Sequence, residues 1–174
     1  MLHTRILSIN DIDLYQQFLL QALHNKSNAF IWGIYDNEIV TAPYLKTTLS
    51  PQNKNYIVFG LFSNQSLIAV STMAHFPIHG LAHKAYLENM CVTGINAEER
   101  KENAALLINY IFNTCEEKNI EIVIASVASN NITAKVFFSD LDFDVLAVEQ
   151  HARKYHDKYI DQHWLIYYLD GTML

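Results

Sequence analysis

Residues 84–126 hold the pattern that most restricts how this chain can fold. Residues 84–93 and 120–126 are two apolar segments of strand length, and the second is rich in β-branched residues. Between them, residues 97–118 have the spacing of an amphipathic helix, whose apolar face is formed by Ala104, Leu107, Ile108, Ile111 and Cys115. A strand, a helix and a strand in this order predict two parallel strands joined by a right-handed crossover.

Further strands and helices are expected on both sides of this unit. The other strands are predicted at 4–8, 56–62, 67–75, 143–153 and 159–169. The other helices are predicted at 11–24, irregularly within 28–50, and from about 131 to about 140. Asn10 or Asp11 is expected to cap the first of these helices, and Asn130 or Asn131 the last. Residues 63–66 are expected to form the turn of a hairpin.

The composition fits one domain that spans residues 1–174. Of the 174 residues, 51% are hydrophobic, which suffices for one core, whereas two domains would each be unusually small. The formal charge of −6 argues against a protein that holds nucleic acid mainly through phosphate contacts. No apolar run is long enough to cross a bilayer, and the first residues lack the apolar core of a secretory signal.

The cysteines indicate a reducing compartment. Cys91 and Cys115 lie in apolar surroundings and have no short paired spacing. Reduced thiols are typical of cytoplasmic proteins, whereas disulfide frameworks belong to oxidising compartments. We therefore expect a cytoplasmic protein that associates with neither membranes nor nucleic acids.

Glu88 is a carboxylate in the middle of an otherwise apolar strand. Simple alternation along the strand places it on the same face as Tyr86, Met90 and Val92. A carboxylate among apolar residues can serve as a proton acceptor for a substrate. The alternative interpretation is an exposed strand residue that faces solvent.

Two adjacent cations, Arg100 and Lys101, lie near the start of the following helix. The first turn of a helix presents backbone N–H groups and a partial positive charge, so it binds phosphate or pyrophosphate readily. Basic side chains beside such a helix start favour an anion site. The alternative is an ordinary solvated helix whose cations are neutralised by Glu98, Glu99 and Glu102.

Several segments together resemble a known family. They are 5–23 with Asn28-Ala29-Phe30, Arg100-x-x-Asn103-x-Ala105, Asn131-x-x-Ala134-x-x-Phe137-Phe138 before Leu141-Asp142-Phe143, and the tail 155–169. In their order and spacing these segments are similar to GNAT-type N-acetyltransferases, which use acetyl-coenzyme A. The resemblance covers nearly the whole chain.

The resemblance implies an α/β (α+β mixed) three-layer fold, with a central mixed, mostly antiparallel, twisted sheet of six to seven strands and flanking helices. It implies transfer of an acetyl group from acetyl-coenzyme A to an amine of a small molecule or peptide. Glu88 would be the catalytic base, and the backbone of Met90, Cys91 and Val92 would polarise the thioester carbonyl. The remaining implied coenzyme A contacts are Arg100, Lys101, Glu102, Asn103, Ala104, Ala105, Asn131, Phe137 and Phe138.

Three departures from the family pattern bear on this expectation. Asn103 replaces a preferred glycine, and asparagine tolerates unusual backbone angles better than most residues. Three glutamates add negative charge around the expected phosphate site. Phe138 stands where many members have a tyrosine that acts as general acid, so another group or water must protonate the departing thiolate. Phe137 and Phe138 also suit a core, and Asn131 suits a helix cap.

Two functions from other classes stay open. One is a non-catalytic coenzyme A-binding sensor or regulatory module, which Phe138 and the acidic helix start favour. The other is a structural homodimer without cofactor, in which the apolar strand 164–169 forms the interface. A homodimer could also accompany the enzymatic function.

The acceptor site is expected to have apolar walls and a negative field. Aromatic residues of the first half suit such walls: Phe30, Trp32, Tyr35 and Tyr44. Carboxylates expected near the pocket, at Glu88, Asp157 and Asp161, favour a cationic acceptor.

No metal site is expected. His75, His79 and His83 have helical spacing, but Pro77 and Gly80 argue against a helix there.

Overall fold

The computed structural model describes residues 1–24, 40–155 and 157–169. The segment 28–30, the part before residue 40 of the range 28–50 in which an irregular helix was predicted, and the aromatic residues Phe30, Trp32 and Tyr35 lie outside the described residues. The later part of that range contains a helix at Ala42–Thr48, as predicted. The strands are β1 (Leu2–Ile6), β2 (Tyr56–Ser63), β3 (Ser66–His75), β4 (Lys84–Val92), β5 (Ile122–Ala128), β6 (Asp144–Tyr155) and β7 (Lys158–Tyr168). The helices are the short η1 (Ile9–Asp11), α1 (Ile12–His24), α2 (Ala42–Thr48), α3 (Ala97–Glu117) and α4 (Ile132–Asp140).

The strands form one mixed sheet in the order β1-β2-β3-β4-β5-β7-β6. Neighbouring described strands are antiparallel except β4 and β5, which run parallel. Parallel strands need a long crossover connection, and the 21 residues of α3 supply it. The predicted mixed, mostly antiparallel sheet with a parallel pair in 84–126 is confirmed.

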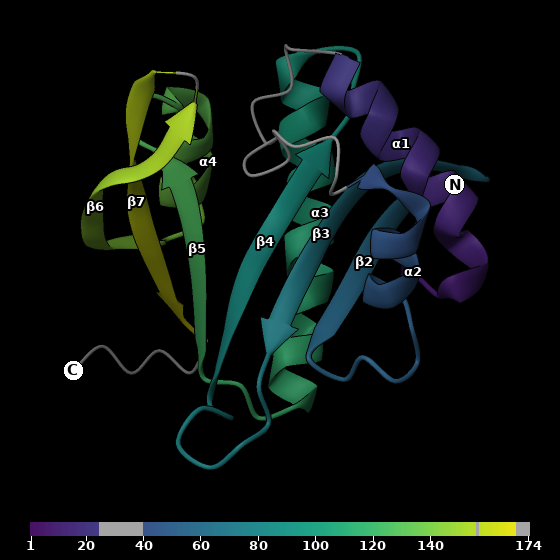
Figure 1. Cartoon of the computed structure of the whole chain (residues 1–174), viewed down its shortest axis with the longest axis horizontal. Helices are drawn as coiled ribbons and strands as arrows, with labels where there is room; N and C mark the ends of the chain where they lie inside the picture. Colours follow the sequence, from purple (N-terminus) through teal and green to yellow (C-terminus); the bar gives the residue numbers. More distant parts are fainter. Residues whose placement is uncertain (25–39, 156, 170–174) are drawn as a thin grey trace.

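Helices cover both faces of the sheet, which gives three layers (Figure 1). α3 and α4 pack on one face, and α1 and α2 pack on the other. The apolar face that the sequence predicted for α3 is confirmed, because all of its members are completely buried: Ala104, Leu107, Ile108, Ile111 and Cys115.

The last hairpin has the two predicted strands, and its second strand lies inside the sheet. β7 lies between β5 and β6, so it is paired along both edges, and β6 forms the edge of the sheet. Leu165 and Ile166 of β7 are buried within the chain itself. Tertiary packing thus covers part of segment 164–169, and its use as a dimer interface stays a prediction.

The first helix begins at a different cap from the one expected. Ser8 is the N-cap of η1, which continues into α1, and Asp11 lies three residues further on. The carboxylate of Asp11 accepts hydrogen bonds from both terminal nitrogens of Arg5, at 2.7 and 2.9 Å, and from the backbone N–H of Ser8 at 2.7 Å. Chiefly because of Arg5, the pKa of Asp11 is lowered to about 2.

The segment between β3 and β4 is a loop, as Pro77 and Gly80 predicted. His75 is the last residue of β3, and its Nε2 lies 2.9 Å from the carbonyl oxygen of Ala82, which ties the loop to the strand. Within the described ranges, no group of three or more His, Cys, Asp or Glu residues is placed to hold a metal ion. None of the described helices is long and apolar enough to cross a membrane.

Candidate functional site

A gap in the sheet between β4 and β5 is the central feature of the site. The two strands pair from Lys84 with Ile122 to Leu87 with Ala125, and the pairing stops there. Beyond this point the strands diverge toward their carboxyl ends, as Figure 1 shows. A ligand can therefore enter the sheet between two rigid strands, which is a common position for a binding site in folds of this kind.

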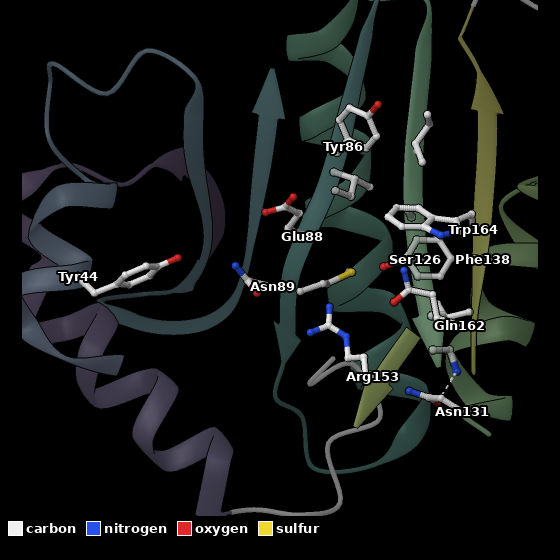
Figure 2. Close-up of a pocket in the computed structure, with 16 residues that line it drawn as sticks. Tyr44, Tyr86, Glu88, Asn89, Ser126, Asn131, Phe138, Arg153, Gln162 and Trp164 are labelled. Atoms are coloured by element: carbon white, nitrogen blue, oxygen red, sulfur yellow. Dashed lines mark hydrogen bonds between the residues drawn. The ribbon is translucent and has the colours of Figure 1, made fainter. Parts of the chain in front are cut away.

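Two cavities meet at this gap. The larger, of about 310 Å³, is lined by residues of β4, β5, β7 and α4, together with one residue each from α2 and β6. The smaller, of about 230 Å³, lies between the sheet and helices α1 and α2. Tyr44, Glu88 and Asn89 line both cavities. Figure 2 shows Glu88 pointing toward Tyr44, with Phe138 and Trp164 on the other side of the larger cavity.

A β-bulge beside Glu88 determines where this carboxylate points. In the β3–β4 ladder Thr72 pairs with Glu88, but Val70 already pairs with Cys91, so β4 carries one extra residue at this point. Asn89 absorbs the irregularity with a φ of 50°, a left-handed conformation that asparagine tolerates better than most residues.

The bulge reverses the alternation that was expected along β4. Met90 and Val92 are buried in the α3 face of the core together with Leu87, whereas Cys91 is buried on the α1 face. Glu88 follows Leu87 and so points to the face opposite to it. The predicted shared face of Glu88 with Met90 and Val92 is wrong, because simple alternation does not hold across the extra residue.

The surroundings of Glu88 act on its acidity in two directions. Partial burial raises the pKa of the Glu88 carboxyl, because water is removed from the charged form. The guanidinium of Arg153 lowers the same pKa by a smaller amount. Arg153 reaches the larger cavity from β6, and Tyr86, which lies on β4 like Glu88, lines the same cavity. A carboxylate with a raised pKa in a cavity is a candidate proton acceptor.

α4 forms the wall of the larger cavity opposite β4. Asn131 caps this helix by accepting a hydrogen bond from the backbone N–H of Ala134 at 3.1 Å. It is one of the two caps that the sequence predicted. Asn131, Ala134 and Phe138 line the cavity. Phe137 packs in the core with its ring centroid 5.4 Å from that of Phe138. Both phenylalanines are thus buried, and Phe138 also contributes to the cavity wall.

The start of α3 differs from the anion site that the sequence predicted. The helix begins at Ala97, so its first turn is acidic and Arg100 is its fourth residue. Asn96 caps the helix by accepting from the N–H of Glu99 at 2.8 Å. The Glu99 carboxylate in turn accepts from the N–H of Ile95 at 2.6 Å. The predicted start of this helix at residue 97 is confirmed, and the two cations Arg100 and Lys101 follow the acidic first turn instead of opening the helix.

Arg100 and Asn103 of the motif Arg100-x-x-Asn103-x-Ala105 make contacts within the protein. Arg100 donates a hydrogen bond to the carbonyl oxygen of Gly94 at 3.2 Å, and a Cβ on Gly94 would lie 2.8 Å from Cγ of Arg100. Asn103 is buried and donates to the carbonyl oxygen of Thr93 at 3.1 Å. These contacts fix the connection between β4 and α3.

Lys101 turns away from the start of α3. Its ammonium group forms an exposed ion pair with Asp140, the last residue of α4. Glu102 is exposed, Ala105 is half-buried, and Ala104 is completely buried. Of the six residues 100–105, Arg100 and Asn103 are therefore the two whose side chains contact the β4–α3 connection.

A family model described as an acetyltransferase (GNAT) domain matches residues 5–164. The chain belongs to the GNAT acetyltransferase family. A probable acetyltransferase from Staphylococcus epidermidis is 38% identical, with a TM-score of 0.83 over 97% of this chain and 99% of that one. An N-acetyltransferase from Staphylococcus aureus is 30% identical, with a TM-score of 0.78 over 98% of this chain and 99% of that one.

More distant GNAT structures share the fold. The putative acetyltransferase yncA from Salmonella typhimurium, solved with its cofactor acetyl-CoA, is 12% identical and has a TM-score of 0.76 over 99% of this chain and 96% of that one. At this identity the likeness concerns the fold. No curated protein sequence matches the chain.

Sequence reasoning missed much of the lining that this GNAT chain places around Glu88. The missed side chains are Tyr86, Asn89, Ser126, Arg153, Gln162 and Trp164. An asparagine inside an apolar strand is a signal of a bulge, and it was available at Asn89. The residues from β6 and β7 gave no such signal, since they reach the cavity through the order of strands in the sheet.

The expected acidic field is also different. Asp161 accepts a hydrogen bond from the backbone N–H of His151 at 2.8 Å and does not line either cavity, nor does the exposed Asp157. Arg153 adds a positive charge to the wall instead. Tyr44 is confirmed as an aromatic wall residue of both cavities.

Proposed function

We propose that this protein is an N-acetyltransferase that moves an acetyl group from acetyl-coenzyme A to an amine of a small molecule or peptide. The observation that carries the proposal is the cavity in the gap between β4 and β5, which brings Glu88 to the border of a second cavity on the α1 side. The α4 side of the larger cavity can hold the arm of the acetyl donor, while the side near Glu88, where the two cavities meet, admits the acceptor. Membership in the GNAT family supports the same assignment.

The residues around the gap fit the flexible arm of acetyl-coenzyme A. Met90, Ala134 and Phe138 give the larger cavity an apolar wall, and Asn131 adds a polar side chain at its α4 side. When bound, acetyl-coenzyme A supplies an acetyl group activated as a thioester. Because the Cys91 side chain is buried on the α1 face, we assign Cys91 to this site through its backbone alone, and we assign Val92 in the same way.

The proposed site for the phosphates of the cofactor, at the β4–α3 connection, is partly occupied by a side chain of the protein. Arg100 lies against the β4–α3 connection and is the cation that we propose to hold pyrophosphate. Glu99 already occupies the N–H of Ile95, a group that would otherwise be available to a phosphate oxygen. Phosphate binding at this loop therefore requires the carboxylate of Glu99 to move.

The proposed chemistry assigns one proton step to this chain. Glu88 takes a proton from the ammonium form of the acceptor, directly or through water, which leaves a neutral amine. The amine nitrogen then bonds to the acetyl carbon as the carbon–sulfur bond breaks, and the nitrogen loses its surplus proton to solvent. Coenzyme A departs as a thiolate and takes its proton from water, since the ring of Phe138 has none to give. We assign the polarisation of the thioester carbonyl to the backbone of β4 at Met90.

The variant Glu88→Gln tests this assignment. It keeps the shape of the side chain but removes the base, so we expect kcat to fall by about 100-fold or more while acetyl-coenzyme A affinity changes little. Release of free thiol over a panel of amines measures turnover, and calorimetry measures binding. Glu121→Gln, an exposed residue just before β5, is the matched control. Full turnover in Glu88→Gln would remove Glu88 from the mechanism.

A non-catalytic coenzyme A-binding module is the second candidate function. The acidic first turn of α3 and the lack of a hydroxyl at Phe138 favour it. Calorimetric binding of acetyl-coenzyme A without thiol release from any amine would support the module over the enzyme. Absence of binding at millimolar cofactor would contradict both.

The compartment that we propose is the cytoplasm. Cys91 and Cys115 are buried thiols, and burial raises the pKa of Cys115 to about 12, which keeps it in the unreactive protonated form. Such thiols suit a reducing environment in which the acceptor and acetyl-coenzyme A are both present.

A further inference from the structure

Gln162 of β7 carries a buried acceptor atom that faces the larger cavity. The side chain is only 4% exposed and lines the cavity. Its Nε2 donates a hydrogen bond to Oε2 of Glu149 at 3.3 Å. Its Oε1 has no hydrogen-bond partner anywhere in residues 1–24, 40–155 and 157–169. Buried carbonyl oxygens are normally paired, so this atom marks a place where a ligand can donate.

Glu149 fixes which end of the Gln162 amide faces the cavity. The same carboxylate oxygen accepts from Nε1 of Trp164 at 2.9 Å, so Glu149 is itself held in place. Turning the amide over would bring its carbonyl oxygen against the negative oxygen of Glu149 and lose the hydrogen bond. The Nε2 group therefore stays toward Glu149, and Oε1 is left for the cavity.

Gln162 lies on the acceptor side of the sheet. In the β5–β7 ladder it pairs with Ala128, and Trp164 pairs with Ser126. Leu165, whose side chain points to the opposite face from that of Trp164, is buried in the α3 core. Gln162 and Trp164 thus share the sheet face that bears Glu88, and Figure 2 shows all three around the same cavity.

We propose that Oε1 of Gln162 binds a hydrogen-bond donor that the acceptor carries in addition to its reacting amine. This inference rests on the proposed N-acetyltransferase function. A cavity of about 310 Å³ is small, so the amine beside Glu88 and the donor on Gln162 belong to one small molecule or to the first residue of a peptide. The donor is an amide N–H or a hydroxyl close to the amine. Gln162 is then a specificity residue for the acceptor.

Three probe amines separate the sources of this donor. Alaninamide carries an amide N–H, alaninol carries a hydroxyl, and alanine methyl ester carries no donor besides its amine. For the native protein we expect kcat/KM for alaninamide or alaninol to exceed that for the ester by roughly tenfold or more, because a site built to accept a hydrogen bond rejects an analogue that lacks the donor. The better of the two donors identifies the source.

The variant Gln162→Met keeps the length of the side chain and removes the acceptor oxygen. We expect it to abolish the preference, so that all three probes react at similar rates, while the KM for acetyl-coenzyme A stays unchanged. Gln65→Met, in the exposed turn between β2 and β3, is the matched control and should keep the preference.

Other outcomes overturn the inference. Equal rates for all three probes in the native protein, or a preference that persists in Gln162→Met, would show that Oε1 does not bind the acceptor, although the proposed function would stand. A raised KM for acetyl-coenzyme A in Gln162→Met, with the preference kept, would assign Oε1 to the cofactor instead. Failure of the native protein to bind acetyl-coenzyme A would remove the proposed function together with this inference.

Discussion

The guanidinium of Arg153 on β6 and the carboxylate of Glu88 on β4 line the same cavity, although 64 residues of chain separate them. Burial raises the pKa of Glu88, and Arg153 partly offsets this effect. A residue from the far edge of the sheet therefore moderates the rise that burial causes in the pKa of the proposed base.

The effect of Arg153 on Glu88 predicts that removing Arg153 changes the pH dependence of activity. A general base works in its deprotonated form, so activity should fall as the pH drops through the raised pKa of Glu88. Arg153→Met removes the cation that lowers this pKa, and we expect the acidic limb of the kcat/KM profile to move to higher pH. Lys154→Met, whose ammonium lies 5.5 Å from the ring centroid of Tyr159, is the control and should leave the limb in place. An unchanged limb in Arg153→Met would mean that another group controls it.

The carboxylate of Glu99 should weaken cofactor binding. It lies at the N–H of Ile95, where a phosphate oxygen would compete with it. We expect Glu99→Gln to raise the affinity for acetyl-coenzyme A by roughly three- to tenfold at low salt, with a smaller gain at high salt, because like charges repel and salt screens them. Calorimetric titration at two ionic strengths measures both effects. Glu117→Gln at the opposite end of α3 should change neither, and a lower affinity in Glu99→Gln would contradict the proposed phosphate site.

Phe138 offers a test of the missing general acid. Its ring lines the cavity and packs against Phe143, with centroids 5.0 Å apart. We expect Phe138→Tyr to raise kcat severalfold without changing the KM for the acceptor, since a hydroxyl at the cavity wall can protonate the departing thiolate. Single-turnover measurements report this step directly.

The matched variant at Phe137 distinguishes chemistry from packing. Phe137 is buried in the core beside Phe138, so Phe137→Tyr should lower the melting temperature and bring no gain in kcat. If Phe138→Tyr fails to fold, the para position of the Phe138 ring lies in the packed core and not at the cavity.

The ion pair between Arg5 and Asp11 predicts a pH-dependent stability. The pKa of Asp11 is about 2 in the folded chain, below the ordinary value of about 3.9 for an aspartate. A lowered folded pKa stabilises the fold above the unfolded pKa, and this contribution is lost as the pH falls from about 4 through about 2. We expect Asp11→Asn to cost about 1 kcal/mol at pH 7, because solvent screens the partly exposed pair.

Denaturant unfolding at pH 7 and near pH 2 measures this difference. The cost of Asp11→Asn should shrink toward zero at the lower pH. Asp13→Asn, two residues further along at an exposed position of α1, should cost less at pH 7. An equal cost of Asp11→Asn at both pH values would show that its effect comes from the hydrogen bonds of Ser8 rather than from charge.

Local patterns predicted most elements of the fold. The apolar spacing of 97–118 gave α3 to within one residue at its C-terminal end, and the hairpin of β2 and β3 followed from alternation around a polar turn. These predictions succeeded because hydrophobic periodicity and turn chemistry act over a few neighbouring residues. The start of α1 was missed because Ser8 and Asp11 act together with Arg5 from β1.

The site was predictable to a smaller extent. Glu88, Phe138 and Asn131 were selected from the sequence, and all three line the cavity. The direction of Glu88 was missed because a single extra residue at Asn89 shifts the strand register. The glutamates at the start of α3 were also evident from the sequence, but the hydrogen bond that Glu99 accepts from the N–H of Ile95 depends on how the loop folds.

The sequence by itself determined the helices, the strands and the parallel pair around α3, because these depend on periodic burial along one segment. The tertiary structure decided which residues meet at the gap. Arg153 and Gln162 reach Glu88 because β7 inserts between β5 and β6, and such a strand order depends on contacts between segments far apart in the chain. The tertiary structure also leaves the Oε1 atom of Gln162 without a hydrogen-bond partner, because the pairing of β6 with β7 places Glu149 next to the Nε2 atom.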